Sequence, residues 1–89
     1  MIRTQVTIIN KLGLHARAAA KFVACTASFS SRIHTGNGGD LVDGKSIMSV
    51  MMLAAGQGTA LDLEIEGPDE QEALKALQNL IDDYFEEGE

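Results

Sequence analysis

The alternation of hydrophobic and polar residues is clearest between residues 60 and 66. Three apolar side chains take turns with three acidic ones there: Leu61, Leu63 and Ile65 against Asp62, Glu64 and Glu66. Such a period of two is typical of a strand with one buried and one solvated face. Weaker patterns predict three more strands, at residues 4–9, 32–35 and 40–42.

Apolar residues at helical spacing predict three helices between these strands. The first, residues 16–27, is rich in alanine, and we expect its core face to carry Ala16, Ala19, Ala20, Val23 and Ala27. The second, residues 46–54, is short and apolar nearly all round. The third opens at residues 67–70, with proline in its first turn and acids near the positive end of the dipole. Its expected core stripe is Leu74, Leu77, Ile81, Tyr84 and Phe85.

The predicted order is strand, helix, strand, strand, helix, strand, helix. This order favours a two-layer α+β domain with the helices on one face of the sheet. A chain of 89 residues supports one small core and leaves no room for a second domain or a deep substrate cleft. We therefore expect a single domain over residues 1–89.

Composition excludes several classes of protein. Hydrophobic residues make up 45% and charged residues 22%, an ordinary globular balance that argues against disorder. No apolar run approaches the ~18 residues needed to span a bilayer, and the start lacks a signal peptide's apolar segment, so we expect a cytoplasmic protein. One cysteine and two histidines form neither an internal disulfide nor the usual zinc site, so neither a metal nor another cofactor is expected.

The net charge of −6 argues against nucleic-acid binding, but it is unevenly distributed. Residues 1–45 hold six of the seven cations and two acids, a balance of +4. Residues 46–89 hold one cation and eleven acids, a balance of −10. A negatively charged ligand would therefore bind in the first half.

The strongest candidate for chemistry lies at the start of the first helix, where His15 takes the predicted N-cap position. Free backbone N–H groups and the positive end of the dipole favour an anion there. Arg17 follows in the first turn and Lys21 one turn later, and guanidinium groups bind phosphate well. A neutral imidazole is a nucleophile that can carry a phosphoryl group. From the residues alone, a histidine that only caps the helix remains an alternative.

A second motif, residues 39–46, matches the nucleotide-binding pattern Gly-x-x-x-x-Gly-Lys-Ser. That motif needs a buried strand before it and a parallel α/β sheet around it, whereas only 43 residues follow Ser46. The context therefore disfavours a P-loop nucleotide binder. Ser46 instead takes the predicted N-cap position of the second helix, where its hydroxyl satisfies a free N–H.

The chain resembles the HPr family, the histidine-containing phosphocarriers of the phosphoenolpyruvate-dependent phosphotransferase system. The resemblance rests on the length, the element order, Gly-Leu-His-Ala-Arg at 13–17 and Gly-Lys-Ser-Ile-Met at 44–48. It implies an open-faced β-sandwich, with a four-stranded antiparallel sheet under three helices.

The resemblance also implies a role for the first motif. His15 would accept a phosphoryl group on Nδ1 from Enzyme I and pass it to an Enzyme IIA-type acceptor. Arg17 and the backbone N–H of Ala16 would stabilise the phosphoryl group. The protein would be a carrier rather than a turnover enzyme, in the sugar-transport or the nitrogen-related branch. Ala18 departs from the proline common in the family, which restores a backbone N–H in the first turn.

For the second motif, the resemblance implies phosphorylation of Ser46 by an HPr kinase. We interpret this as a switch that slows transfer to His15, because it adds negative charge near the surface that meets Enzyme I. The alternative is that Ser46 only caps its helix. A regulatory module that acts mainly by binding is also possible, although the presence of both His15 and Arg17 argues against it.

The second helix also suggests a docking surface. One arc, expected in the core, holds Val50, Leu53 and Ala54. The opposite arc is expected to be exposed and to contact partner enzymes, framed by Lys21 and Lys45; it holds Ile47, Met48, Met51 and Met52. Alternatively both arcs are buried, for example by a neighbouring subunit. We expect a monomer that binds neither nucleic acid nor membrane.

Overall fold

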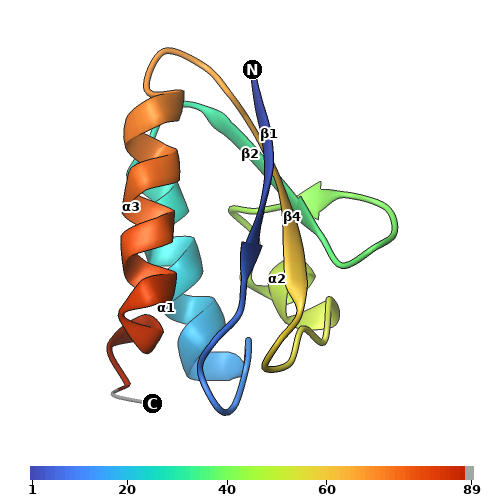
Figure 1. Ribbon diagram of the computed structural model, residues 1–89. Coiled ribbons are helices and arrows are strands. Elements are labelled where there is room, and N and C mark those ends of the chain that lie inside the picture. Colours follow the sequence, from blue (N-terminus) through green and yellow to red (C-terminus); the bar gives the residue numbers. More distant parts are fainter. Residues whose placement is uncertain (88–89) are drawn as a thin grey trace.

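The chain folds into a four-stranded sheet with helices packed on one face (Figure 1), in a computed structural model that describes residues 1–87. The elements follow the predicted order: β1 (Ile2–Thr7), α1 (Ala16–Ala27), β2 (Arg32–Gly36), β3 (Val42–Asp43), α2 (Ile47–Met52), β4 (Ala60–Glu66) and α3 (Glu70–Asp82). A short turn of 3-10 type, η1 (Tyr84–Glu86), follows α3. The strand order is β1-β4-β2-β3, and every neighbouring pair is antiparallel. The predicted fold class is confirmed.

Strand β4 lies in the middle of the sheet and supplies its core. Its bounds are those predicted, and Leu61, Leu63 and Ile65 are buried while the acids between them are at least partly exposed. Ile65 lies opposite Ile2 of β1 and Ile33 of β2, so the apolar positions of three strands meet on one face. Helices α1 and α3 cover that face (Figure 1).

Helix α1 has the predicted bounds, but the prediction of its buried face was only partly right: Ala19 is buried and Val23 packs against the core. Ala16, Ala20 and Ala27 are exposed and Val23 is half-buried. The buried positions are Ala18, Ala19, Phe22 and Thr26. Alanine occurs on both faces and gives little hydrophobic contrast, so the large ring of Phe22 determines which face turns inward.

The bounds of the other strands and of α2 also differ from the predictions, although β2 differs by only one residue. Strand β1 ends at Thr7 rather than at residue 9, and β3 is reduced to two residues, 42 and 43. Helix α2 is shorter than expected, and Ala54 follows it, exposed and with a φ of 52°. Of the expected core arc of α2, only Val50 is fully buried, while Leu53 is half-buried.

Helix α3 begins at Glu70 with Asp69 as its N-cap residue, so Pro68 precedes the helix instead of lying in its first turn. Leu77 and Ile81 are buried as predicted. The helix then stops at Asp82, and residues 84–86 all adopt positive φ angles. Of the two aromatic residues expected in the core stripe of this helix, Phe85 is fully buried, as predicted, whereas Tyr84 is exposed. This turn lies at the end of the molecule where α1 begins (Figure 1) and contacts that helix.

The N-cap residue of α3 ties that helix to the start of β2. The Asp69 carboxylate accepts hydrogen bonds from the Ser31 hydroxyl at 2.5 Å and from the Ser30 and Ser31 backbone N–H groups, both at 2.9 Å. The Ser31 hydroxyl, followed by the Ser30 backbone N–H, holds the pKa of the Asp69 carboxyl below its usual value.

Because this pKa is lower in the folded than in the unfolded state, the ionised carboxylate stabilises the fold above the unfolded pKa. That stability is lost as the pH falls through the folded pKa. We therefore predict that Asp69→Asn is less stable than the parent chain at pH 7, and that the difference shrinks as the pH falls below about 4. Urea unfolding across that pH range measures it.

Asp40→Asn is the matched control, because Asp40 lies exposed in a loop and makes no side-chain hydrogen bond within residues 1–87. Its difference from the parent should be small at every pH. A deficit of Asp69→Asn that stayed constant down to acid pH would contradict the assignment.

Candidate functional site

His15 is the N-cap residue of α1, as predicted. Its backbone is extended, with φ −71° and ψ 178°, and its side chain makes no capping hydrogen bond. The first intrahelical bond runs from the Ala19 N–H to the His15 carbonyl, at 2.8 Å. The N–H groups of Ala16 and Arg17 therefore have no acceptor within the helix and mark its positive end.

The loop before His15 is clamped against the end of α2. The Leu14 N–H donates to the Ala55 carbonyl at 2.8 Å. Gly13 has a φ of +67°, and a Cβ at this position would lie 2.4 Å from the same carbonyl oxygen. Only glycine fits such a conformation and such a close approach.

The His15 ring faces the far end of the chain. Its Nε2 lies 2.5 Å from Oε2 of Glu87, whose other carboxylate oxygen accepts a hydrogen bond from Asn10 Nδ2 at 3.0 Å. The same Asn10 nitrogen also donates to the Gly13 carbonyl at 2.9 Å. The side chains of His15 and Glu87 are 29% and 12% exposed. Sequence reasoning missed Asn10 and Glu87, because nothing in the pattern of residues indicates that the last residues return to His15.

Arg17 is exposed beside His15, and its guanidinium makes no hydrogen bond or ion pair within residues 1–87. Next to the free N–H groups of the first turn, it provides a cation that an incoming anion can bind. Ala16 is also exposed, so its backbone N–H can be reached from solvent. The structure thus brings together three of the predicted site residues: His15, Ala16 and Arg17.

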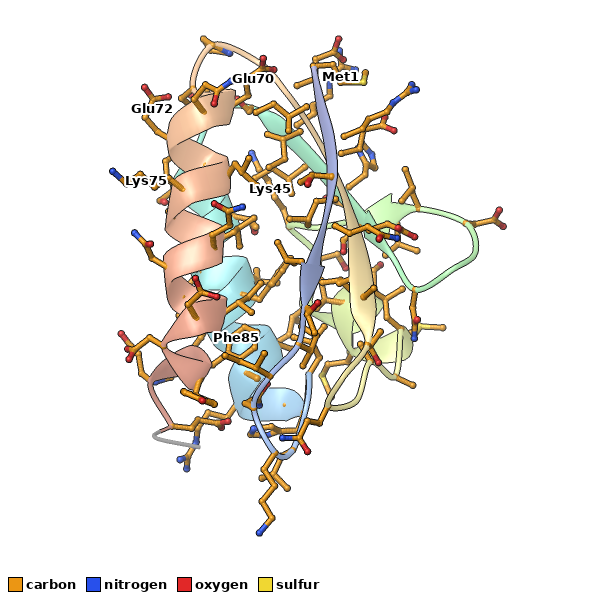
Figure 2. The ribbon with its side chains drawn as sticks, in the orientation of Figure 1. Met1, Lys45, Glu70, Glu72, Lys75 and Phe85 are labelled. Atoms are coloured by element: carbon orange, nitrogen blue, oxygen red, sulfur yellow. The ribbon has the colours of Figure 1, made fainter. Side chains whose placement is uncertain are left out.

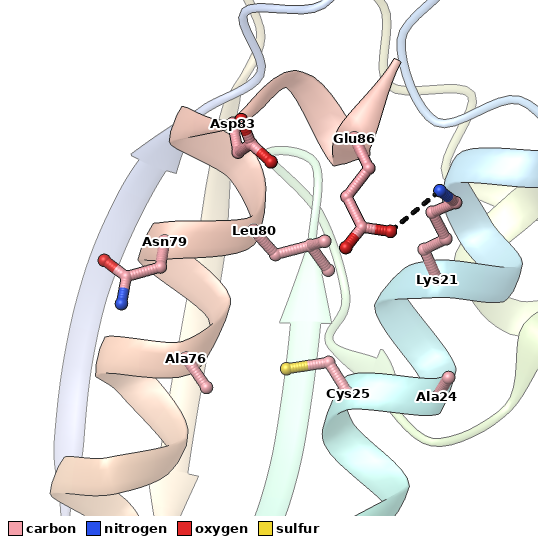
Figure 3. Close-up of a pocket in the computed structure, with 8 residues that line it drawn as sticks. All are labelled: Lys21, Ala24, Cys25, Ala76, Asn79, Leu80, Asp83 and Glu86. Carbon is pink, nitrogen blue, oxygen red and sulfur yellow. Dashed lines mark hydrogen bonds and ion pairs between the residues drawn. The ribbon is translucent and has the colours of Figure 1, made fainter. Parts of the chain in front are cut away.

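Lys21 forms an ion pair with Glu86 at 2.9 Å across the space between α1 and the turn after α3 (Figure 3). Its charge is thereby partly neutralised, which the sequence did not predict. Both residues line a groove of about 520 Å³ between α1 and α3, together with Ala24, Cys25, Ala76, Asn79, Leu80 and Asp83. Burial raises the pKa of the Cys25 thiol in this groove.

Lys45 lies far from His15, toward the other end of α1. Its Nζ donates to the Phe29 carbonyl at 2.7 Å, just beyond the last residue of α1, whereas His15 lies at the first. A helix of 12 residues is about 18 Å long. In Figure 2, Lys45 accordingly lies toward one end of the molecule and Phe85 toward the other.

Ser46 is the N-cap residue of α2, as predicted, and its hydroxyl accepts a hydrogen bond from the Ser49 N–H at 3.4 Å. The preceding Gly44 donates its N–H to the Ile33 carbonyl at 2.8 Å, which holds this segment against β2. The helix that follows has only six residues, and the sheet is antiparallel. This arrangement is not the strand–loop–helix of a P-loop.

The outer face of α2 is exposed, as predicted. We define the apolar patch as Ile47, Met48, Met51 and Met52, which are 39%, 66%, 38% and 80% exposed. Leu12, in the loop just before His15, is 68% exposed and was missed, because a lone leucine in a loop gives no periodic signal. The Ala55 carbonyl, just after α2, accepts a hydrogen bond from the Leu14 N–H in that loop. The end of the apolar patch therefore lies near the loop that carries His15.

Comparisons with known proteins agree with this geometry. An open-faced α+β sandwich that presents a histidine at the start of its first helix is the architecture of a small histidine phosphocarrier. The family model described as "PTS HPr component phosphorylation site" matches residues 2–83. The chain therefore belongs to the HPr family and is a phosphocarrier of the phosphotransferase system.

Individual relatives cover the whole chain. It is 59% identical over 86 residues to the phosphocarrier protein HPr of Pseudomonas aeruginosa, covering 96% of each protein. It is 55% identical to that of Cupriavidus necator, covering 100% of each. A crystal structure of HPr-C-His from Thermoanaerobacter tengcongensis superposes with a TM-score of 0.92 at 46% identity, covering 98% of each chain. Within residues 1–87, no helix is both long and apolar enough to cross a membrane.

Proposed function

We propose that Nδ1 of His15 accepts the phosphoryl group from phospho-Enzyme I and passes it to an Enzyme IIA-type acceptor. The observation that carries this proposal is the place of the ring. It is partly exposed at an extended N-cap, at the helix end whose first-turn N–H groups are free. Arg17, in the same turn, is exposed and its guanidinium makes no hydrogen bond or ion pair within residues 1–87. The protein acts as a monomer in the cytoplasm and needs neither metal nor cofactor.

The reaction is an in-line transfer between two histidines. The Nδ1 lone pair of His15 forms a bond to phosphorus while the bond from phosphorus to the donor nitrogen breaks, and that electron pair returns to the donor. The three phosphoryl oxygens carry the charge, which Arg17 and the N–H groups of Ala16 and Arg17 stabilise. The partner enzyme supplies the other half of the site.

We predict that His15→Ala takes up no phosphate from Enzyme I and phosphoenolpyruvate, because the acceptor nitrogen is lost. The parent chain should take up one phosphoryl group, stable in alkali and labile in acid. Intact-protein mass spectrometry after each treatment measures both.

His34→Ala is the control, because it removes the other histidine, in β2, and leaves α1 untouched. It should be phosphorylated like the parent. Normal uptake by His15→Ala would contradict the proposed acceptor. Absence of uptake by the parent chain would instead favour the alternative of a module that acts by binding alone.

The apolar patch, extended by Leu12, is the proposed docking surface for both enzymes. Four exposed apolar side chains cluster on a helix of six residues, and such a cluster is typical of an interaction site. Flexible methionine side chains can adapt to more than one partner. Lys21 lies on α1, one turn beyond Arg17, and its side chain stays 32% exposed despite the ion pair with Glu86, so it can contact acidic groups of a partner. Lys45, at the other end of the patch, can contact a partner's rim but not the phosphoryl group.

We predict that Met48→Glu weakens binding to Enzyme I by about 10-fold or more, because it puts a charge into the middle of a desolvated contact. Its free energy of unfolding should stay close to the parent value, since Met48 is 66% exposed. Titration calorimetry and urea unfolding measure the two quantities.

Leu41→Glu is the matched control, since Leu41 is an exposed apolar residue outside the patch, in the loop before β3. Its affinity should be unchanged. Equal affinities of Met48→Glu and the parent for Enzyme I would contradict the proposal that the apolar patch is part of the interface.

Ser46 is the proposed site of regulation by an HPr kinase. Its hydroxyl is partly exposed at the start of α2, and the next two residues, Ile47 and Met48, belong to the apolar patch. A phosphate there would suit the start of the helix but would bring negative charge to the surface that meets Enzyme I.

We predict that Ser46→Asp slows phosphoryl transfer from Enzyme I by about 10-fold, mainly through slower association, because it places a charge beside the docking surface. Ser46→Ala, which loses the cap but gains no charge, should transfer at the parent rate. Rapid-quench kinetics compares the three chains, and equal rates for Ser46→Asp and the parent would end the proposal of a switch.

A further inference from the structure

We infer that Glu87 is a positioning residue for phosphoryl transfer: its carboxylate accepts the Nε2–H of His15 and so keeps Nδ1 unprotonated. This inference rests on the proposed function, because it says which nitrogen the phosphoryl group can reach. The carrying observation is the 2.5 Å contact between Nε2 and Oε2 of Glu87.

The contact determines the tautomer of the ring. An ionised carboxylate can only accept hydrogen bonds, so the hydrogen between the two atoms belongs to Nε2. A neutral imidazole carries one hydrogen, so Nδ1 then keeps its lone pair. Nδ1 has no hydrogen-bond partner within residues 1–87, whereas Nε2 is covered by a carboxylate that is 12% exposed. Of the two ring nitrogens, the one with the free lone pair is therefore also the one that no hydrogen-bond partner within residues 1–87 occupies.

Asn10 holds the carboxylate in place. It is fully buried, and its Nδ2 donates to both Oε1 of Glu87 and the Gly13 carbonyl. The reversed amide would turn Oδ1 toward two acceptors, so the orientation of Asn10 is determined by its neighbours. In the observed orientation, the buried Oδ1 finds no donor within residues 1–87. A buried oxygen without a donor lowers the stability of the fold. The two hydrogen bonds that Nδ2 donates offset this cost and explain why an asparagine is buried here.

The backbone after α3 is shaped to deliver Glu87 to this place. Tyr84, Phe85 and Glu86 have φ angles of 56°, 52° and 64°, a region that non-glycine residues rarely adopt. Three such residues in succession persist only where the surroundings hold them. Two anchors do so here: the Phe85 ring, fully buried at the lower end of α3 in Figure 2, and the ion pair from Glu86 to Lys21 in Figure 3.

The same contact matches the charge changes of the reaction. When the Nδ1 lone pair forms the bond to phosphorus, the donor nitrogen recovers its own electron pair and the hydrogen stays on Nε2. The ring is then cationic, and the Glu87 carboxylate stabilises that cation at hydrogen-bond distance. On transfer to the acceptor, the electron pair returns to Nδ1 and the ring leaves as neutral imidazole. No proton has to move on His15 in either direction. A carboxylate plays the corresponding part for the histidine of a Ser-His-Asp triad.

The test is ¹⁵N NMR of the full chain with labelled histidine, before any phosphorylation. In the parent chain, the His15 signals should show a protonated, pyrrole-type Nε2 and an unprotonated, pyridine-type Nδ1. In Glu87→Gln, Asn10 should hold the amide oxygen, so that the amide NH₂ faces Nε2 and the hydrogen moves to Nδ1. The two signals should then exchange types.

The rate of phosphorylation by Enzyme I should fall about 10-fold or more in Glu87→Gln, because the second partner of a ring nitrogen orients it for reaction. Asp82→Asn is the control: it also removes one carboxylate near the end of α3, where Asp82 is exposed and makes no ion pair within residues 1–87. It should keep the parent tautomer and rate. Glu87→Ala, which offers Nε2 no partner, should retain the fold by circular dichroism and lie between the parent and Glu87→Gln in tautomer ratio.

A pyridine-type Nε2 in the parent, an unchanged tautomer in Glu87→Gln, or an exchanged tautomer with a parent rate would each overturn the inference. The failure of the proposed function is distinct. In that case the parent chain itself would take up no phosphate at His15, whatever the NMR spectrum shows.

Discussion

The clamp around the start of α1 is the constraint on which the rest of the site depends. The loop from Asn10 to Leu14 is held from one side by the Ala55 carbonyl and from the other by Glu87. Gly13 makes the first contact possible because only glycine tolerates both its φ of +67° and the carbonyl 2.4 Å from where a Cβ would be. With the loop fixed, His15 takes an extended backbone at the N-cap, and the first-turn N–H groups remain free.

Because of this geometry, the charge around His15 differs from the net charge of the chain. The chain carries −6 overall, and its second half is strongly acidic, yet the site for an anion lies in the first half. The fold brings two acids of the second half back to that site: Glu86 pairs with Lys21, and Glu87 takes the side of the ring away from Nδ1. Arg17 is left as the exposed cation next to His15, so the attraction for a phosphoryl group is local rather than a property of the whole surface.

The parts that the sequence predicted are those with a local signal. The alternation at 60–66 gave the bounds of β4 because each residue reports directly on which face it occupies. The N-cap position of Ser46 followed from a residue type that favours helix starts, and that of His15 from the start of the alanine-rich helical segment. The buried face of α1 was predicted only in part, because alanine on both sides gives no contrast.

The sequence gives no local signal that residues 84–87 lie near the start of α1. Positive φ angles usually reveal themselves through glycine, and here they fall on Tyr84, Phe85 and Glu86. The distance of Lys45 from the histidine is likewise a tertiary fact, since it depends on how α2 lies along α1 rather than on the residues near either one. The position of Glu87 at His15 and the distance of Lys45 from His15 both depend on contacts between segments that are far apart in the chain.

The central claim is that His15 carries the phosphoryl group on Nδ1 and a hydrogen on Nε2. Phosphorus–nitrogen coupling in NMR spectra of the phosphorylated chain with ¹⁵N-labelled histidine tests both halves at once. The account predicts coupling of phosphorus to Nδ1 of His15 and a protonated Nε2 in the same ring. Coupling to Nε2, or to a histidine other than His15, would contradict it.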